Sequence, residues 1–342
     1  MRRGGGGLVA AYLERLEGEA KTLHAEFPGE LDTIYFGGGT PSHLTDDELR
    51  FIVDILQETW GFPARHETTL EADPATFDKA RLETFKALGF SRLSIGLQST
   101  QDGVLEFLGR QHTGRAGLAA VESALADGFE VSADLITAVP GGDAERDLHT
   151  LAQTGVPHVS VYNLTVEPNT PFARRGVRID EDRELDDYEL ADRVLSGYGL
   201  GRYEVSSHAK PGHEAKHNQV YWSGNHFLAL GPSAASFVPS AGLLGERRTN
   251  PAMRAWLEHR PPEVLPIDPK MFVQDVLMTG LRTRRGVDLA SLSKRSGIDV
   301  NEHYADELKD LREKGLLEHS GPYLHTTPSG LLQLNRVVAA FF

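Results

Sequence analysis

Short apolar segments alternate with amphipathic segments of helical length along the first two thirds of the chain. The apolar segments are typical of buried strands, and the others repeat apolar side chains at helical spacing. The expected strands are 31–36, 68–71, 92–98, 131–139, 158–166 and 203–206. The expected helices are 8–25, 46–59, 76–88, 101–108, 114–127, 143–154 and 182–198. This repeat, with a period of roughly 30 residues, predicts an α/β fold with a parallel sheet and right-handed crossovers.

The pattern changes near residue 232, and prolines make residues 236–270 linker-like. Beyond them we expect helices at 272–281, 301–314 and 330–342 and a hairpin at 315–327. The sequence therefore predicts a barrel-type domain over residues 1–235 and a small winged-helix-like module over residues 271–342. That module carries nine Lys and Arg against nine Asp and Glu, which favours packing or docking over DNA binding.

The segment LDTIYFGGGTPS, residues 31–42, joins the first expected strand to its helix. The apolar run stops at three consecutive glycines, Gly37 to Gly39, and Thr40 follows. Glycines lack a Cβ atom, so they reach positive φ and let a ligand approach the backbone closely. Turns of this kind place small anionic or zwitterionic ligands at strand ends in α/β proteins. The alternative is a glycine-rich turn without a ligand, but the complete string between strand and helix favours a site.

Polar residues stand at or near the ends of the next three strands. Glu71 could hold an ammonium group or ribose hydroxyls, and Gln98 could bond to a carboxylate or a ribose. Arg110 follows a helix and could make a forked contact with a carboxylate. Asp134 lies inside the apolar strand VSADLITAV, where a buried carboxylate needs a partner. Each has an alternative role as a helix cap, surface charge or core acid, but together they suit a zwitterionic, amino-acid-like cofactor that carries a ribose.

Four histidines lie in the string HAKPGHEAKHNQVYWSGNH, which begins at His208. His213 and His217 are four positions apart and would share a helix face, but the Pro-Gly before His213 indicates a loop. A zinc site would need a fuller ligand set than these residues provide. A neutral imidazole also ligates heme iron, and the neighbouring aromatic side chains would supply apolar surface for a macrocycle. From residue types alone, an exposed polar loop ranks before a heme site.

The composition narrows the classes of function. Of the 342 residues, 40% are hydrophobic and 25% are charged, as in an ordinary globular protein. The net charge of −14 argues against a broad nucleic-acid or anionic-membrane surface, so no nucleic-acid partner is expected. We place the protein in the cytoplasm, because no apolar run approaches the ~20 residues that span a bilayer and MRRGGGGLVA lacks a signal-peptide core. The chain has no cysteine, which excludes disulfides, Cys nucleophiles, thiolate–zinc sites and Cys-ligated iron–sulfur clusters within it.

Seven strings of the chain resemble, in order, the oxygen-independent coproporphyrinogen III oxidase-like radical SAM proteins. They are YFGGGTPS (35–42), LEADP (70–74), LSIGLQS (93–99), LGRQH (108–112), DLITAVPG (134–141), VYNLTVEPNTPFAR (161–174) and HNQVYW (217–222). The resemblance covers nearly the whole chain, including the carboxyl-terminal module. Its most specific features are GGGTPS and the spacing from Gln98 to Arg110 to Asp134.

The resemblance implies a partial (β/α)6 barrel with S-adenosylmethionine and a [4Fe-4S] cluster as cofactors. It also implies the residues that line the S-adenosylmethionine site, namely Gly38, Gly39, Thr40, Glu71, Gln98, Arg110 and Asp134. The family begins with a strand and a CxxxCxxC-type loop whose thiolates hold the cluster, and this chain contains neither. We therefore expect a barrel without its first strand, no ligated cluster, no radical chemistry and no catalytic residue. The chain would be either a fragment of a longer protein or a cluster-free relative.

The string HNxxY at His217 is similar to the heme-binding signature of the heme chaperone branch of this family. This similarity makes His217 the candidate heme ligand. A heme site now becomes the preferred interpretation of the segment, before an exposed polar loop. It implies delivery of heme to an acceptor apoprotein, with a peripheral contact where that acceptor is membrane-bound. Two alternatives stay open: anaerobic oxidative decarboxylation of coproporphyrinogen III, and a cluster-free S-adenosylmethionine-binding module.

Overall fold

The computed structural model describes residues 6–61 and 67–342. These residues fall into two compact units. The sheet unit consists of residues 32–46 and 67–214, and the terminal unit consists of residues 6–31, 47–61 and 215–342. Each unit has its own secondary structure.

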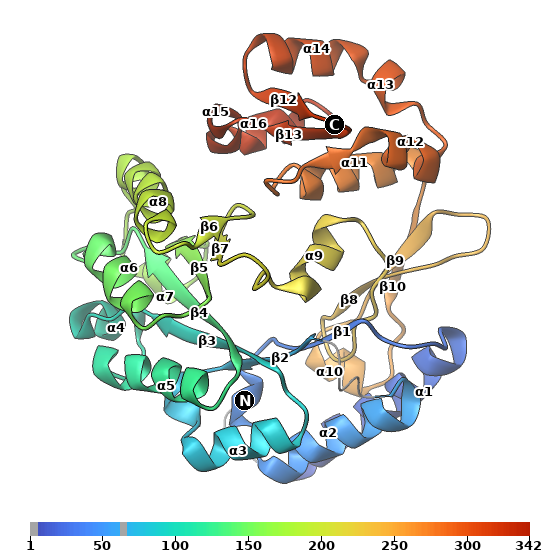
Figure 1. Cartoon of the computed structure of the whole chain (residues 1–342). Coiled ribbons are helices and arrows are strands. Elements are labelled where there is room, and N and C mark those ends of the chain that lie inside the picture. Colours follow the sequence, from blue (N-terminus) through green and yellow to red (C-terminus); the bar gives the residue numbers. More distant parts are fainter. Residues whose placement is uncertain (1–5, 62–66) are drawn as a thin grey trace. The chain divides into compact units, whose positions relative to one another are not determined.

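The sheet unit is built on one seven-stranded sheet with the order β1-β2-β3-β4-β5-β7-β6 (Figure 1). Its strands are β1 Thr33–Phe36, β2 Glu67–Ala72, β3 Arg92–Gln98, β4 Glu130–Thr137, β5 His158–Asn163, β6 Gly201–Arg202 and β7 Ser207–Ala209. Strands β1 to β5 are parallel, and no strand precedes β1 within the described residues. Strand β1 is therefore an edge of the sheet.

The sixth strand differs from the sequence prediction. A parallel strand over residues 203–206 is wrong, because β6 and β7 form a short antiparallel hairpin and β7 pairs antiparallel with β5. The residues between them close the turn, where the N–H of Tyr203 donates to the carbonyl of Ser207 at 3.0 Å. Glu204 in this turn is buried although it belongs to no strand.

The helices of the sheet unit follow the predicted order. They are α3 Lys79–Ala87, α4 Asp102–Leu108, α5 Gly114–Ala126, α6 Ala144–Gln153, α7 Pro171–Arg174 and α8 Glu181–Ser196, with the 3₁₀ helices η1 Pro41–His43 and η2 Pro74–Thr76. Helix α3 begins later than predicted because Asp78 caps it, accepting a hydrogen bond from the N–H of Arg81 at 3.0 Å. Long helices such as α3, α5 and α6 lie on the outer side of the sheet (Figure 1).

The two faces of the parallel strands differ sharply in polarity. One face packs under the helices and is apolar, with Leu70, Leu93, Leu97 and Leu135 fully buried. The other, which we call the inner face, carries polar side chains and glycine at alternate positions: Tyr35, Glu71, Ser94, Gly96, Gln98, Asp134, Ser160 and Tyr162. Parallel strands that are buried on both faces are usually apolar on both. The polar inner face therefore indicates a surface that meets water or a ligand.

The terminal unit contains the first two helices and residues 215–342. Its helices are α1 Gly6–Glu26, α2 Asp46–Thr59, α9 Lys216–Trp222, α10 Met253–Leu257, α11 Pro269–Gly280, α12 Leu289–Ser296, α13 Val300–His303, α14 Ala305–Glu313, α15 Pro328–Leu332 and α16 Leu334–Ala339. Its strands are β8 Ala235–Val238, β9 Gly245–Thr249, β10 Glu263–Ile267, β11 Val287–Asp288, β12 Leu317–Ser320 and β13 Tyr323–Thr326. The predicted hairpin near residue 321 is the pair β12 and β13, within a three-stranded antiparallel sheet of order β11-β13-β12.

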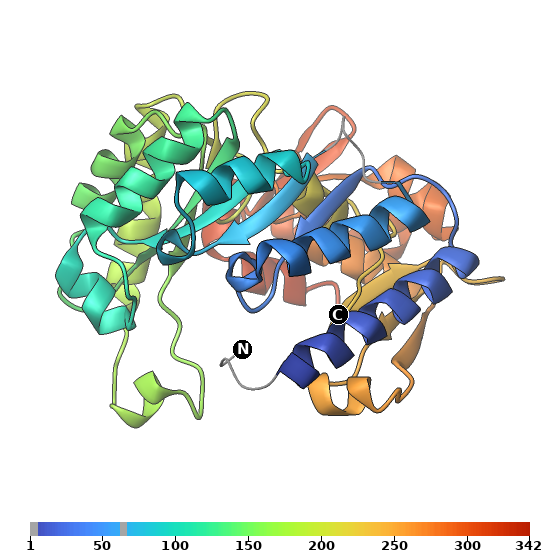
Figure 2. The same ribbon diagram turned by 90° about the horizontal axis from the view of Figure 1, so that it is seen from below.

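Residues 236–270, expected to be linker-like, instead form most of a second antiparallel sheet of order β10-β9-β8 together with α10. Prolines obscured this sheet in the sequence. Pro266 lies in β10, and a proline is tolerated there because β10 is an edge strand. Helix α1 runs alongside this part of the chain (Figure 2), where Arg15 Nε donates to the carbonyl of Trp256 at 3.2 Å. Among residues 6–61 and 67–342, the helices lack the continuous apolar length that a membrane span requires.

Candidate functional site

The glycine turn after β1 has an unusual backbone. Gly38, Gly39 and Thr40 all have positive φ, at 75°, 86° and 64°. Two glycines adopt this conformation without strain, but a threonine does not, and such strain is concentrated at functional sites. The hydroxyl of Ser42 anchors the following η1 by accepting a hydrogen bond from the N–H of Asp73 at 3.1 Å. The turn is therefore held open at the carboxyl end of β1.

Glu71 at the end of β2 is fixed by this turn. Its Oε2 accepts a hydrogen bond from the N–H of Gly38 and its Oε1 one from the hydroxyl of Tyr35, each at 3.0 Å. A Cβ atom on Gly37 would come within 2.9 Å of Glu71 Oε1, so a larger residue there would displace the carboxylate. Burial, followed by the nearby carboxylates of Glu71 and Asp134, raises the pKa of Tyr35 well above its usual value. The tyrosine therefore stays protonated and donates to Glu71.

Gln98 ends β3 in a strained conformation. Its φ is 66°, and the N–H of Ser99 donates to the carbonyl of Leu97 at 2.8 Å, which defines a γ-turn of the rare positive-φ type. The pairing register between β3 and β4 shifts just before Gln98. Its amide lies over Gly96, where a Cβ atom would be only 2.8 Å from Nε2. The turn thus folds the Gln98 amide back onto the inner face.

Asp134 continues the polar row across β4. The hydroxyl of Ser94 donates to Asp134 Oδ2 at 3.2 Å, and Ser94 is the neighbour of Glu71 in the sheet. Desolvation raises the pKa of Asp134 to about 6; hydrogen bonds from Ser160 and Ser94 oppose this shift, and the charge of Glu71 adds to it. Two carboxyl groups therefore face one region of the inner face.

The inner face thus joins several of the sequence-predicted residues. Gly38, Glu71 and Asp134 are linked through direct contacts or through Ser94, and Gln98 lies four residues beyond Ser94 on the same strand. Two neighbouring carboxyl groups repel each other and favour a cationic ligand, and they also accept hydrogen bonds from hydroxyls. The arrangement suits a ligand that carries a positive charge and a ribose.

The remaining predicted residues lie differently. Arg110 is exposed after α4, and its guanidinium faces Asp73 at 3.7 Å. The backbone of Gly39 and Thr40 shapes the turn, as described above. His217 belongs to the terminal unit, whereas the other seven predicted residues belong to the sheet unit.

His217 lies in the first turn of α9 and contacts an exposed aromatic side chain. Its Nε2 lies 2.8 Å from the hydroxyl of Tyr221, one helical turn further on. Tyr221 is 37% exposed and packs edge-on against Phe227, with ring centroids 4.6 Å apart. His217 and these two rings form a partly exposed aromatic surface. Such a surface suits one edge of a flat apolar ring.

The other histidines of this region have different roles. His208 is buried in β7, and its Nε2 accepts a hydrogen bond from Arg202 Nε at 3.2 Å. His213 lies in a loop, as predicted, and its Nδ1 is 2.7 Å from Glu130 Oε2. The expectation that the histidines are simply exposed is therefore wrong for His208.

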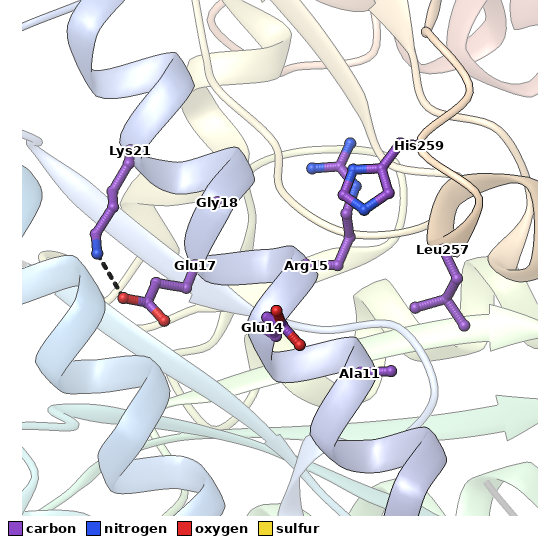
Figure 3. Close-up of a pocket in the computed structure, with 8 residues that line it drawn as sticks. All are labelled: Ala11, Glu14, Arg15, Glu17, Gly18, Lys21, Leu257 and His259. Atoms are coloured by element: carbon purple, nitrogen blue, oxygen red, sulfur yellow. Dashed lines mark hydrogen bonds and ion pairs between the residues drawn. The ribbon is translucent and has the colours of Figure 1, made fainter.

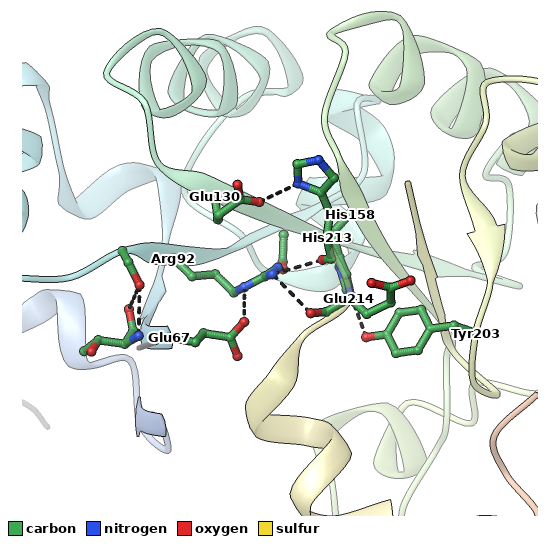
Figure 4. Close-up of polar contacts among 10 residues, drawn as sticks. Glu67, Arg92, Glu130, His158, Tyr203, His213 and Glu214 are labelled. Atoms are coloured by element: carbon green, nitrogen blue, oxygen red, sulfur yellow. Dashed lines mark hydrogen bonds and ion pairs between the residues drawn. The ribbon is translucent and has the colours of Figure 1, made fainter. Parts of the chain in front are cut away.

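The amino end of the inner face is closed by a buried arginine (Figure 4). Arg92 is 3% exposed; its Nε donates to Glu67 at 2.9 Å, its Nη1 to Ser132 at 2.9 Å and its Nη2 to the carbonyl of His213 at 2.9 Å. Each guanidinium nitrogen of Arg92 is hydrogen-bonded to another group of the protein. The Arg92 side chain is therefore committed to contacts within the protein at this end of β3. The open end of the same strand is the one that carries Gln98.

A pocket beside α1 is lined by Ala11, Glu14, Arg15, Glu17, Gly18, Lys21, Leu257 and His259 (Figure 3). It carries charges of both signs, and Lys21 Nζ lies 2.5 Å from Glu17. None of the sequence-predicted residues lines it. We find no chemical pattern there that points to a particular ligand.

The residues of this chain do not fit an iron–sulfur cluster. The chain has no cysteine, and no group of three or more His, Asp or Glu in the described part of the chain could hold a metal ion. Thiolates are the usual ligands of such clusters. The polar inner face, by contrast, presents the carboxyl groups of Glu71 and Asp134, which can accept hydrogen bonds from a ligand that carries positive charge and hydroxyls.

Several residues of the inner face were missed by the sequence analysis. Tyr35, Ser94, Gly96 and Ser160 lie inside segments that we interpreted as apolar strands. Their signal is the alternation of polar and apolar positions within β3, where Arg92, Ser94, Gly96 and Gln98 share one face. Polar residues at every second position of a parallel strand therefore indicate that one face of the strand is polar.

Comparison with known proteins identifies similar sequences over almost the whole chain. The Radical SAM superfamily model matches residues 3–154, and the HemN C-terminal domain model matches residues 267–332. The heme chaperone HemW of Bacillus subtilis is 30% identical over 353 residues, which cover 97% of this chain and 91% of that protein. The heme chaperone HemW of Mycobacterium tuberculosis is 35% identical over 348 residues, which cover 97% of this chain and 82% of that protein.

A solved structure has the same fold. Coproporphyrinogen III oxidase (HemN) from Escherichia coli matches with a TM-score of 0.82 over 97% of this chain and 83% of that chain, at 20% sequence identity. This match confirms the predicted α/β radical-SAM-type partial barrel with a small carboxyl-terminal antiparallel module. At this identity the match establishes the fold and not the activity.

Proposed function

Because this chain belongs to the HemN-like radical SAM family, in its HemW heme chaperone branch, we propose that it binds heme and delivers it to an acceptor apoprotein. The observation that carries the proposal is similarity along the whole length to proteins named heme chaperones, combined with the position of His217. The similarity covers 97% of the chain and includes α9.

The surroundings of His217 support a heme-binding role. A neutral imidazole is a common axial ligand of heme iron. His217 sits on a helix beside Tyr221 and Phe227, so an iron ligand and an apolar surface adjoin each other. Heme would be cargo for this protein, held through His217 and covered in part by these aromatic side chains.

Titration with hemin alone, followed by absorbance in the Soret region, tests the proposal. We expect His217→Ala to weaken hemin binding at least about tenfold, because the axial ligand is lost. His226→Ala is the matched control, since His226 is exposed on the same segment, where it lies 3.2 Å from the carbonyl of Leu244 and packs against the ring of Phe237. Equal binding by His217→Ala and the wild type would overturn the assignment of His217.

Delivery needs a separate measurement. The hemin-loaded protein is mixed with an apoprotein of known, tighter heme affinity, and transfer is followed by the absorbance of the acceptor. Transfer faster than release of hemin into buffer supports active delivery. Transfer at the release rate would leave a heme-binding protein without a chaperone role.

We also propose that the inner face binds S-adenosylmethionine. Glu71 and Asp134 would face its charged groups and its ribose. Gln98 would form hydrogen bonds with its polar atoms, and the turn at Gly38 would lie close to its amino-acid end. When bound next to a cluster, this cofactor supplies a radical; these residues by themselves bind and orient it. Calorimetric titration with S-adenosylmethionine tests the proposal, and loss of binding in Glu71→Gln is the expected result.

Binding of S-adenosylmethionine without binding of hemin would favour the alternative of a cluster-free binding module. The absence of cysteine from the chain is the observation that keeps this alternative in view. The two titrations together therefore separate the two functions.

A further inference from the structure

Asp147 on α6 contacts the two residues that directly follow Gln98. Its Oδ2 accepts a hydrogen bond from the hydroxyl of Ser99 at 2.6 Å. Its Oδ1 accepts from the N–H and the hydroxyl of Thr100, at 2.9 and 2.5 Å. Asp147 is 4% exposed and Ser99 is fully buried. A buried carboxylate with three donors is a strong and specific anchor.

The anchored segment contains the strained turn at Gln98. Residues other than glycine are strained at positive φ and persist there only where their surroundings hold them. The three hydrogen bonds of Asp147 fall on Ser99 and Thr100, and none falls on Gln98 itself. The carboxylate thus holds the carboxyl-terminal side of the turn.

The amino-terminal side of the turn is held separately. The carbonyl of Leu97 accepts the N–H of Ser99 and also lies 3.0 Å from Nε2 of His112, which is buried. With both flanks fixed, Gln98 has no freedom to return to ordinary strand geometry. Its amide is thereby kept over Gly96 on the inner face.

We propose that Asp147 is a positioning residue that holds Gln98 in its left-handed conformation and keeps the Gln98 amide in the ligand site of the inner face. This inference rests on the proposed S-adenosylmethionine site for its functional meaning. Asp147 itself touches no ligand, because both of its carboxylate oxygens accept hydrogen bonds from Ser99 and Thr100. It acts on the ligand only through Gln98.

The next strand offers a matched control. Ala138 follows β4 with a φ of 55°, and its N–H donates to Oδ2 of Asp187 on α8 at 2.8 Å. Asp187 is 7% exposed, so it is a buried carboxylate that anchors a strained strand end, as Asp147 is. The residue it anchors has only a methyl side chain. Replacing Asp187 therefore removes a similar anchor but moves no polar side chain that could contact the ligand. The effect of such a variant on binding shows how much comes from structural disturbance alone.

The first experiment is a double-mutant cycle on the affinity for S-adenosylmethionine, measured by calorimetry on the whole chain. We expect Asp147→Ala and Gln98→Ala each to weaken binding by about tenfold, and the double variant to bind no more weakly than Gln98→Ala. Asp187→Ala should bind as the wild type does. Independent losses that multiply in the double variant, or unchanged binding in Asp147→Ala, would overturn the proposal. If Asp147→Ala does not fold, Asp147→Asn replaces it in the cycle.

The second experiment does not depend on the ligand. Residue-resolved hydrogen exchange follows the N–H of Ser99, which bonds to Leu97 and not to Asp147. We expect this N–H to exchange faster by about tenfold or more in Asp147→Ala and to be unchanged in Asp187→Ala. Unchanged protection of Ser99 in Asp147→Ala would overturn the proposal. A wild-type chain that binds no S-adenosylmethionine would overturn the function proposed for the inner face, whereas the exchange of Ser99 would still decide whether Asp147 holds the turn.

Discussion

The main-chain N–H of Gly38 donates to Oε2 of Glu71 at 3.0 Å, and this bond joins the glycine turn of β1 to the end of β2. The second carboxylate oxygen accepts the hydroxyl of Tyr35 at the same distance. Glu71 is thereby fixed before any ligand arrives. A preorganised carboxylate loses little conformational entropy on binding, which favours affinity.

Gly37→Ala should disrupt this arrangement. The new Cβ atom would lie 2.7 Å from Cε1 of Tyr35 and 2.9 Å from Oε1 of Glu71, so both side chains must move. We expect the affinity for S-adenosylmethionine to fall by about tenfold or more, because the preorganised carboxylate is displaced. Calorimetric titration of the variant measures this loss.

Gly103→Ala is the control for this substitution. Gly103 lies in α4, where an added Cβ atom would meet nothing within 4 Å, and alanine favours a helix over glycine by about 1 kcal/mol. This variant should bind as the wild type does and be slightly more stable. Wild-type affinity in Gly37→Ala would show that the position of Glu71 does not matter for binding.

Asp134 should make the stability of the sheet unit depend on pH. Desolvation raises its pKa to about 6 from an ordinary value of 3.8. The unfolded chain therefore loses this proton first as the pH rises, and the ionised carboxyl destabilises the folded state most fully above about pH 6. Asp134→Asn removes that cost, so we expect the variant to be more stable than the wild type at neutral pH by roughly 1–3 kcal/mol.

Urea unfolding of both proteins between about pH 5 and pH 7 checks this prediction. The stability gained by Asp134→Asn should shrink as the pH falls through about 6, where the wild-type carboxyl takes up its proton. A difference that stays constant over this interval would show that Asp134 titrates at its ordinary pKa. Ser94→Ala gives a further check, because it removes a hydrogen bond that favours the ionised form.

The periodicity of the chain predicted most of the fold because the parallel strands and their helices are local patterns. Helix α2 and strand β3 have the predicted bounds, 46–59 and 92–98. The prediction failed where pairing with a distant strand decides the structure. Residues 203–206 form a turn because the short strands on either side pair with each other and with β5.

The candidate site was predicted in part, since polarity at strand ends marked Glu71, Gln98 and Asp134. The sequence alone did not reveal how these side chains are held. Asp147 holds the Gln98 turn by a hydrogen bond to Ser99, although the two residues are 48 positions apart in the sequence. No local sequence pattern connects Asp147 with this turn. Gly96 likewise matters only because the Gln98 side chain folds back over it.

Glu19 should be a major contributor to the stability of the terminal unit. It is 7% exposed and accepts hydrogen bonds from the N–H of Gly231 at 2.9 Å, Nδ2 of Asn250 at 2.6 Å and Nε1 of Trp256 at 3.3 Å. Glu19→Ala leaves these buried donors without their acceptor. We expect a loss of about 2–4 kcal/mol in the free energy of unfolding.

Tryptophan fluorescence during urea unfolding measures this effect selectively, because Trp60, Trp222 and Trp256 all lie in the terminal unit. Glu17→Ala on the same helix is the control, since Glu17 pairs with Lys21 on the exposed side of α1. Its loss should cost less than about 1 kcal/mol. Equal losses in the two variants would contradict the role given to Glu19.

Tyr221→Phe tests how His217 would meet heme iron. The Tyr221 hydroxyl lies 2.8 Å from Nε2 of His217, so one ring nitrogen is already engaged within α9. A ligating imidazole commonly donates from one nitrogen to a hydrogen-bonding partner while the other meets the metal, and loss of that partner costs about 10–100-fold in affinity. With Tyr221 as this partner, hemin binding should weaken about tenfold in Tyr221→Phe. Tighter binding would instead mean that the hydroxyl competes with iron for Nε2, so that Tyr221 masks the ligand until heme displaces it.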